Sequence, residues 1–304
     1  MKIAYLLPGF VRKKENLETI KTFLENNNRH QIDIYSSTYN IFGAETKEPS
    51  RGYSVKNKLS KNFADNKFIF KKLKINNYDH INDEISKFGK KYKYLIKKSN
   101  PEFWEKINKS MLSFEDESTT LRLIYGQWSM LLSTFNLIEN PHNYDLIIRS
   151  RYDADVNFLK LDKFLNTVNE NTIYLKLRSN EYKLDNSLKI NPINDVLTMG
   201  NAISMKIFCE FGKKENLIKL FEDQEFSSND FYKEKGKDIK LSSEMLMYYW
   251  LFIVNKLKQK DIPEFLFPSN GILKRYKWPS EEKLFNRIRR KIFKFFGKDK
   301  KFFY

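Results

Sequence analysis

The first 35 residues constrain the fold more than any other part of this chain. Residues 2–7 have the pattern of a short buried strand, which the turn residues Pro8 and Gly9 end. Apolar residues then recur at helical spacing over about 13–26, and residues 31–35 predict a second strand. A strand, a helix and a strand in so short a stretch are typical of a βαβ unit with parallel strands. Ligands of such sheets bind beyond the carboxyl ends of the strands, so functional residues are expected there.

The rest of the chain continues this α/β pattern around one divergent stretch. The further predicted elements are helices near 119–138, 212–222 and 242–257, and strands over 144–149 and 172–177. Residues 40–118 carry few strand signals and many Lys and aromatic residues, which indicates a mainly helical insertion with a helix near 80–98. We expect one domain over 1–270, including this insertion, and a separate tail over 271–304. Trp128 is expected in the core rather than as a platform for a sugar.

Cysteine and histidine usage excludes several kinds of site. Cys209 is the only cysteine among 304 residues, which excludes intramolecular disulfides and cysteine-built metal centres. We expect its thiol to be buried and inert. The three histidines, His30, His80 and His142, lie far apart in the sequence and match no spacing typical of metal ligands.

Two aspartates form the strongest candidate for chemistry, because they follow an apolar strand directly. Asp153 and Asp155 are separated by one residue and can reach a single divalent ion, directly or through water. Mg²⁺ and Mn²⁺ favour such oxygen ligands and keep positions open for phosphate oxygens. Arg149 and Arg151 beside them offer forked N–H donors for phosphate or carboxylate. The alternative is a polar turn with surface ion pairs, and the position after a buried strand favours the functional interpretation.

The other candidate residues each have a structural explanation of similar weight. Pro8 and Gly9 let the backbone approach a ligand closely, and Arg12 can reach a phosphate, although the same residues suit an ordinary strand-to-helix turn. Asp195 or Glu244 could be the general base that activates an acceptor hydroxyl. Alternatively, Asp195 is a turn residue and Glu244 complements the dipole of its helix.

In their order along the chain, these motifs resemble bacterial glycosyltransferases of capsule and lipopolysaccharide biosynthesis clusters. The similar segments are Gly9–Arg12, Asp33–Tyr39, Tyr144–Asp153, Asn194–Gly200 and Ser243–Met245. The third of these matches the family phrase Tyr-Asp-hydrophobic-hydrophobic-Ile-Arg-X-Arg-X-Asp closely. Ser37 and Tyr39 depart from the family pattern, which bears on the donor more than on the reaction class. The resemblance covers about 1–39 and 119–260, and it does not extend to 40–118 or to the tail.

The resemblance implies a GT-A-like fold whose Rossmann-type domain binds a nucleotide-sugar donor. It implies that Asp153 and Asp155 hold a divalent metal, Mn²⁺ or Mg²⁺, on the donor diphosphate. The expected acceptor is a surface glycan, such as a capsular, lipopolysaccharide or other lipid-linked glycan. The residues expected to bind the donor and its phosphates are Pro8, Gly9, Arg12, Thr38, Arg149 and Arg151.

Part of the net charge of +17 lies in the last 22 residues. Residues 283–304 contain nine Lys and Arg against the single acid Asp299, which leaves a net charge of +8 on this segment. Its apolar residues Leu284, Ile288 and Ile292 fall on one helical face. Such a basic amphipathic helix can lie on an anionic membrane, with about 1 kcal/mol for each basic residue near the surface. The alternative is a helix packed on the domain with a solvated basic face.

Two other functions are compatible with parts of this pattern. A transferase of another phosphate-activated group could use the same residues. The positive charge also suits a nucleic-acid-binding protein, but the chain has no helix-turn-helix, RNA-recognition or zinc-finger signature. No stretch approaches the ~18 consecutive apolar residues of a membrane-spanning helix. We therefore expect a cytoplasmic protein, peripheral on the inner face of the cytoplasmic membrane.

Overall fold

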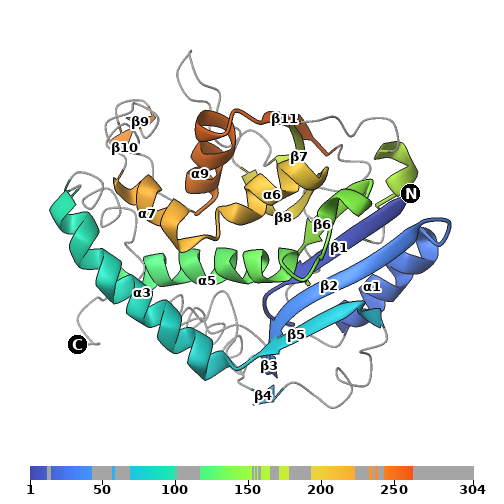
Figure 1. The fold of residues 1–304 in the computed structure, drawn as a ribbon, viewed down its shortest axis with the longest axis horizontal. Helices are drawn as coiled ribbons and strands as arrows, with labels where there is room; N and C mark the ends of the chain where they lie inside the picture. The colour runs from blue at the N-terminus through green and yellow to red at the C-terminus, as the bar shows by residue number, and fades with distance from the viewer. Residues whose placement is uncertain are drawn as a thin grey trace, which may run out of the picture.

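The computed structural model of this chain describes a central sheet and helices on both of its faces (Figure 1). The described residues are 1–11, 15–42, 57–58, 69–99, 101, 117–152, 154, 156, 159–164, 171–177, 193–222, 233–234, 237–238 and 243–262. The prediction of an α/β fold is confirmed. The expected tail over 271–304, with its amphipathic helix, lies outside the described residues.

Seven strands form the sheet, in the order β11-β7-β8-β6-β1-β2-β5. These strands are β1 (Lys2–Pro8), β2 (Gln31–Tyr39), β5 (Lys72–Asn76), β6 (Leu146–Ser150), β7 (Thr172–Leu177), β8 (Ile193–Gly200) and β11 (Lys258–Asp261). β1 pairs in parallel with β2 and β6, β2 with β5, and β11 with β7. β8 is antiparallel to both of its neighbours. The sheet is therefore mixed but mostly parallel, which is compatible with a Rossmann-like fold.

Two short antiparallel pairs and several helices complete the described structure. The short pairs are β3 (Ile41–Phe42) with β4 (Asn57–Lys58), and β9 (Lys233–Glu234) with β10 (Lys237–Asp238). The α-helices are α1 (Glu15–Asn26), α3 (Tyr78–Ser99), α5 (Glu117–Phe135), α6 (Ala202–Glu210), α7 (Lys214–Glu222) and α9 (Ser243–Tyr248). The shorter turns are the 3₁₀ segments Pro141–Asn143 and Leu161–Phe164 and the π-helical segment Tyr249–Val254. Among the described residues, no helix has the length and apolar character needed to cross a membrane.

The order of the strands sets a switch point between β1 and β6. From β1 the chain crosses through α1 to β2 and then reaches β5 on the same side, whereas β6, β8, β7 and β11 lie on the other side of β1. Crossover connections diverge at such a point, and this leaves a crevice at the carboxyl ends of the two central strands. The βαβ unit predicted from the first 35 residues is confirmed by the parallel pairing of β1 with β2.

Both faces of the sheet are buried, and β1 shows this most clearly. Ala4 and Leu6 face the helices α5, α6, α7 and α9, whereas Ile3, Tyr5 and Leu7 face α1. The sequence of such a strand is a nearly continuous apolar run, because neither face of the strand is in contact with water.

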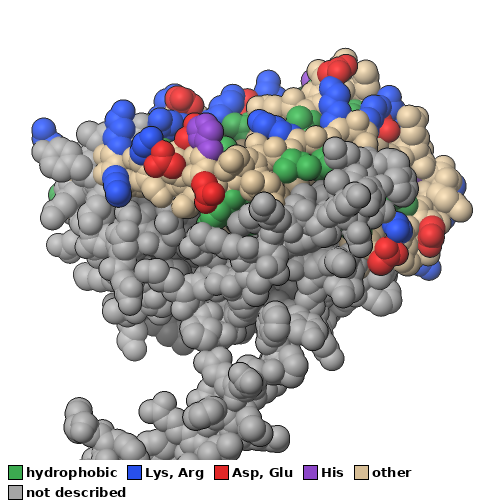
Figure 2. Space-filling model, turned by 90° about the horizontal axis from the view of Figure 1, so that it is seen from below, with side chains coloured by type: hydrophobic (Ala, Val, Ile, Leu, Met, Phe, Trp, Pro, Cys, Tyr) green, Lys and Arg blue, Asp and Glu red, His purple; other side chains and the backbone are tan. Residues whose placement is uncertain are grey.

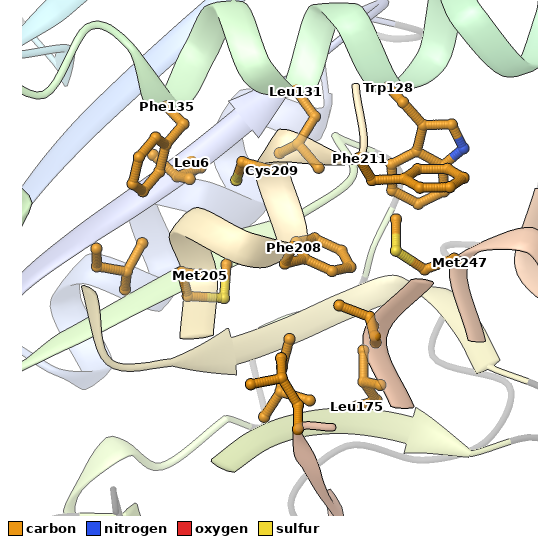
Figure 3. Close-up of a cluster of buried hydrophobic side chains, with 14 of the residues drawn as sticks. Leu6, Trp128, Leu131, Phe135, Leu175, Met205, Phe208, Cys209, Phe211 and Met247 are labelled. Carbon is orange, nitrogen blue, oxygen red and sulfur yellow. The ribbon is translucent and has the colours of Figure 1, made fainter. Parts of the chain in front are cut away.

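On the α5 side of the sheet, side chains of α5 and α6 pack together in the core. Figure 3 shows Trp128 and Leu131 of α5 directed toward Phe208 and Cys209 of α6. The predictions that Trp128 is a core residue and that Cys209 is a buried thiol are confirmed. Burial raises the pKa of the Cys209 thiol well above its ordinary value, so the group is neutral at physiological pH.

The expectation of a mainly helical stretch over 40–118 is wrong in one respect. Its predicted helix near 80–98 is confirmed by α3, but β5 belongs to the main sheet and pairs in parallel with β2. β5 has the sequence Lys-Leu-Lys-Ile-Asn and occupies the edge of the sheet, where lysines are common because they block further strand pairing. Its lysines obscured the strand signal.

The structure also corrects the expectation for the segment around Asp195. The sequence left a turn as the alternative for Asp195, but residues 193–200 form β8 in the interior of the sheet. The polar pair Asn194 and Asp195 stands at the beginning of this strand and gives it the sequence of a turn.

The predicted helix over 242–257 is shorter than expected, because α9 passes into a π-helical segment that ends at Val254, and β11 follows.

Candidate functional site

The carboxyl ends of β1, β2 and β6 bring several predicted residues to one edge of the sheet. Pro8 ends β1 in register with Ser37 of β2, and the backbone N–H of Gly9 donates a 2.9 Å hydrogen bond to the Ser37 carbonyl. Thr38 is the next residue of β2, and Arg151 follows the end of β6. This edge lies at the switch point, where ligands of open α/β sheets bind.

The beginning of β8 reaches the same edge, because this strand runs antiparallel to β6. Ser150 is in register with Leu197, and the backbone N–H of Arg151 donates a 3.1 Å hydrogen bond to the Val196 carbonyl. Asp195 immediately precedes Val196, so its backbone lies beside the end of β6. The fold thus brings residues from four predicted motifs to one place.

Gly9 makes the turn by which the chain leaves β1. Its φ angle is +95°, a conformation that residues with a side chain rarely adopt. Among the described residues, no atom would lie within 4 Å of a Cβ atom at this position, so this part of the structure leaves the space beside the backbone open. A ligand can therefore approach the main chain closely at this point.

Thr38 is completely buried at the end of β2. Among the described residues, no group forms a hydrogen bond with its Oγ1 atom. Alternation along the strand puts its side chain on the same face as Ser36, whose hydroxyl donates to the Leu7 carbonyl at 2.7 Å. An unpaired buried hydroxyl is costly, so the Thr38 hydroxyl is suited to contact a ligand at this edge.

The two predicted arginines lie in different surroundings. Arg149 is only 2% exposed on the α5 side of β6, with its guanidinium carbon 5.8 Å from the centre of the Trp128 ring. Thr198 is its neighbour in register on β8. Arg151 is half-buried beyond the end of the strand. Arg151 is therefore the better positioned of the two to meet a ligand from solvent, and Arg149 supplies a positive charge beneath the edge.

Three aromatic side chains that sequence reasoning missed gather at this edge. The ring of Phe10 lies 4.2 Å from that of Tyr39 and 5.7 Å from that of Tyr78, and the two tyrosine rings are 5.6 Å apart. Burial raises the pKa of Tyr39, which keeps its phenol neutral. The three come from the end of β1, the end of β2 and the start of α3, so only the fold brings them together. Phe10 and Tyr39 lie in segments that resemble the family, whereas nothing in the sequence around Tyr78 indicated a functional residue.

Buried hydroxyl groups fix the segment that follows β6. The Tyr5 hydroxyl lies 2.6 Å from the Ser150 hydroxyl, and the Tyr152 hydroxyl forms a short hydrogen bond with that of Ser36. Burial is the main cause that raises the pKa of both tyrosines, so both phenols are neutral. Three strands are thereby joined just before the predicted metal-binding aspartates.

The predicted metal ligands themselves are outside the part of the chain that the structure describes. This holds for Asp153 and Asp155 as whole residues, and also for Arg12. Asp195 and Glu244 have described backbones in β8 and α9, but their side chains are not described. No cluster of three or more His, Cys, Asp or Glu suited to a metal occurs within the described ranges.

The neighbours of the two aspartates are nevertheless described. Tyr152, Ala154 and Val156 are all buried, and the Ala154 N–H donates to the Arg151 carbonyl at 3.1 Å. Asp153 and Asp155 alternate with these buried residues in the sequence. Two carboxylates therefore belong to a segment that is anchored where the parallel strands end. Carboxylate oxygens are the ligands that Mg²⁺ and Mn²⁺ prefer, so the chemistry of this segment fits such an ion.

Comparison with known proteins adds no family to these observations. Neither a scan against protein-family models nor a search of curated proteins finds a match to this chain. What the structure shows is an α/β fold with a mostly parallel sheet and a set of candidate residues gathered at its carboxyl edge.

Proposed function

We propose that this protein is a glycosyltransferase that moves a sugar from a nucleotide-sugar donor to a glycan acceptor. The observation that supports this most is the gathering of Gly9, Thr38 and Arg151 at the switch point of the sheet. These residues belong to motifs far apart in the sequence, and the sequence alone predicts each of them as a ligand-binding residue. The order of those motifs resembles that of bacterial glycosyltransferases.

Each residue group has a role that follows from the charge changes of sugar transfer. When the nucleoside diphosphate leaves, negative charge develops on its phosphate oxygens, and fixed positive groups stabilise that charge. Arg151 and the open backbone at Gly9 can contact these oxygens. A divalent metal bound by Asp153 and Asp155 would supply further positive charge there. Asp195 or Glu244 would accept the proton of the acceptor hydroxyl.

The acceptor we propose is a lipid-linked surface glycan, which the basic tail would help to reach. Residues 283–304 would lie on anionic lipid and keep the domain at the membrane. Deletion of residues 281–304 should abolish binding to phosphatidylglycerol-containing vesicles without changing the far-ultraviolet circular dichroism of the domain beyond the lost segment. Equal vesicle binding by the full chain and the truncated chain would contradict this role.

The donor site is tested most simply by thermal-shift measurements with a panel of sugar nucleotides. We expect at least one sugar nucleotide to raise the midpoint in the presence of Mn²⁺, and we expect Asp155→Asn to remove this effect. A shift that needs no metal and survives Asp155→Asn would move the donor site away from the aspartates. Shifts with activated phosphates that lack a sugar, and none with sugar nucleotides, would favour transfer of a different group.

The surface in Figure 2 bears on the nucleic-acid alternative. On the described part of this face, basic side chains alternate with acidic ones instead of forming a continuous basic stripe. Nucleic-acid-binding surfaces concentrate Lys and Arg along the path of the phosphates. This face therefore offers no support for the nucleic-acid alternative, and sugar transfer remains the proposal.

A further inference from the structure

A groove on the outer side of α5 takes no part in the proposed donor site. It has a volume of about 440 Å³, within the ~300–1,000 Å³ typical of small-molecule sites. α5 forms its floor with Tyr125, Ser129 and Ser133, which recur at helical spacing, and Leu137 follows just beyond the end of the helix. The start of α7 contributes to the lining, and Lys74 of β5 contributes from the edge of the sheet. α3, α5 and α7 contact one another here, as Figure 1 illustrates.

The charges around this groove are predominantly positive. Lys74, Lys213 and Lys214 line it, and Glu215 is the one acid among the lining residues that the structure describes. Lys213 is partly neutralised, because its Nζ lies 2.6 Å from a carboxylate oxygen of Glu210 outside the groove. Lys74 is exposed, and its Nζ lies 3.4 Å from the hydroxyl of Ser133. The local balance favours an anionic ligand.

The uncharged lining is of the kind that binds hydroxyl-rich molecules. Ser129 and Ser133 present hydroxyl groups, and Asn136 presents a side-chain amide that can both donate and accept. The half-buried ring of Tyr125 stacks on Phe88 of α3 at a centroid distance of 4.2 Å, which fixes its position at one end of the groove. Aromatic rings and neutral hydrogen-bonding groups together suit a sugar, which has apolar ring faces and polar edges.

We propose that this groove binds an acidic saccharide, meaning a sugar chain that carries carboxylate or phosphate groups. The lysines contact the acidic groups, and the serines and Asn136 contact the hydroxyls. This inference does not rest on sugar transfer, since binding can be measured without donor, metal or turnover.

Contacts at Ser133 decide which variants can test the proposal. Its hydroxyl lies 3.2 Å from that of Ser37 in β2, and the Ser37 carbonyl accepts from Gly9 at the candidate donor site. A change at Ser133 would therefore disturb the sheet edge as well as the groove. Lys74 is exposed at an edge strand and is the better choice. Lys206 of α6, exposed and outside the groove, is a matched control.

The test is calorimetric titration of the full chain with tetragalacturonate, its fully methylated neutral ester, and tetraglutamate. We expect the acidic sugar to bind about tenfold more tightly than the ester and than the peptide. Lys74→Ala should weaken this binding about fivefold, whereas Lys74→Arg and Lys206→Ala should leave it unchanged. Urea unfolding verifies that each variant is folded.

Several results would overturn the proposal. Equal affinity for the acid and the ester would exclude recognition of the carboxylates, and equal loss in Lys74→Ala and Lys206→Ala would locate binding outside the groove. Tetraglutamate binding as tightly as the sugar would show recognition of negative charge alone. A phosphorylated tetrasaccharide that binds in place of the carboxylated one, with the same dependence on Lys74, would support the proposal and identify phosphate as the acidic group.

Discussion

The carboxylate of Asp33 in β2 binds residues that precede β5 and β6, at the amino-terminal side of the sheet. One of its oxygens accepts hydrogen bonds from the Lys71 ammonium at 2.6 Å and from the Tyr144 hydroxyl at 2.7 Å. The Tyr144 hydroxyl also lies 2.6 Å from that of Tyr35. Burial alone would raise the pKa of Asp33, but the hydrogen bonds from Lys71 and Tyr144 outweigh it and lower the pKa below its ordinary value. Asp33 belongs to a predicted motif, yet its contacts in the fold are structural.

Asp33→Asn should therefore destabilise the protein in a pH-dependent way. Because folding lowers the pKa of Asp33, the carboxylate contributes stability above its ordinary pKa of 3.8, and this contribution is lost as the pH falls through the folded-state pKa. We expect the variant to be less stable by about 1–2 kcal/mol at pH 7, with a difference that shrinks below about pH 4. Urea unfolding over this range measures it. The exposed control Glu84→Gln should have little effect, and a constant difference for Asp33→Asn down to pH 3 would contradict the assignment.

Among the elements, α5 and the turn between α6 and α7 pack with their backbones in contact. A Cβ atom at Gly212 would lie 2.0 Å from the carbonyl oxygen of Trp128, so this turn requires glycine for steric reasons. The Trp128 ring meets Phe208 and Phe211 edge-on, at centroid distances of 5.7 and 5.2 Å. This close approach holds α6 against α5 and the sheet, and their side chains form the buried cluster that Figure 3 shows.

Gly212→Ala should consequently separate the turn from α5 and lower the free energy of unfolding by about 3 kcal/mol. Gly126→Ala, in α5 itself, is the matched control. Its Cβ would meet only the end of the flexible Ile85 side chain, at 2.9 Å, and alanine favours the helix by about 1 kcal/mol. Urea unfolding of both variants provides the comparison. Similar stability of the two variants would show that the contact with Trp128 does not limit the packing.

The periodicity of apolar residues predicted the elements that pack against the core. It failed for strands whose residue types depend on their position in the sheet. β1 was predicted because its apolar residues form one run, and α1 because its apolar residues recur at helical spacing. β5 was missed since an edge strand tolerates lysines such as Lys72 and Lys74, and β8 was misread since Asn194 and Asp195 begin it. Such residues are compatible with a strand only in a particular tertiary environment.

At the scale of the whole molecule, the strand order determines which predicted residues meet. A mostly parallel sheet gathers the carboxyl ends of β1, β2 and β6, and the antiparallel β8 adds the backbone beside Asp195. Gly9, Thr38 and Arg151 could therefore be predicted as neighbours from the sequence. The aromatic group at Tyr78 could not, because its three members are brought together only by α3 packing beside the end of β2.

The proposal of sugar transfer at this edge is tested most directly by release of the nucleoside diphosphate from the best-binding sugar nucleotide. Turnover is measured with Mn²⁺ for the wild type, Asp153→Asn, Asp155→Asn and the control Lys206→Ala, each verified as folded by its urea transition. We expect the wild type and Lys206→Ala to release product equally, and each asparagine variant to be slower by about a hundredfold or more. Equal turnover by the wild type and both asparagine variants would contradict a transfer site at the carboxyl edge built on these aspartates.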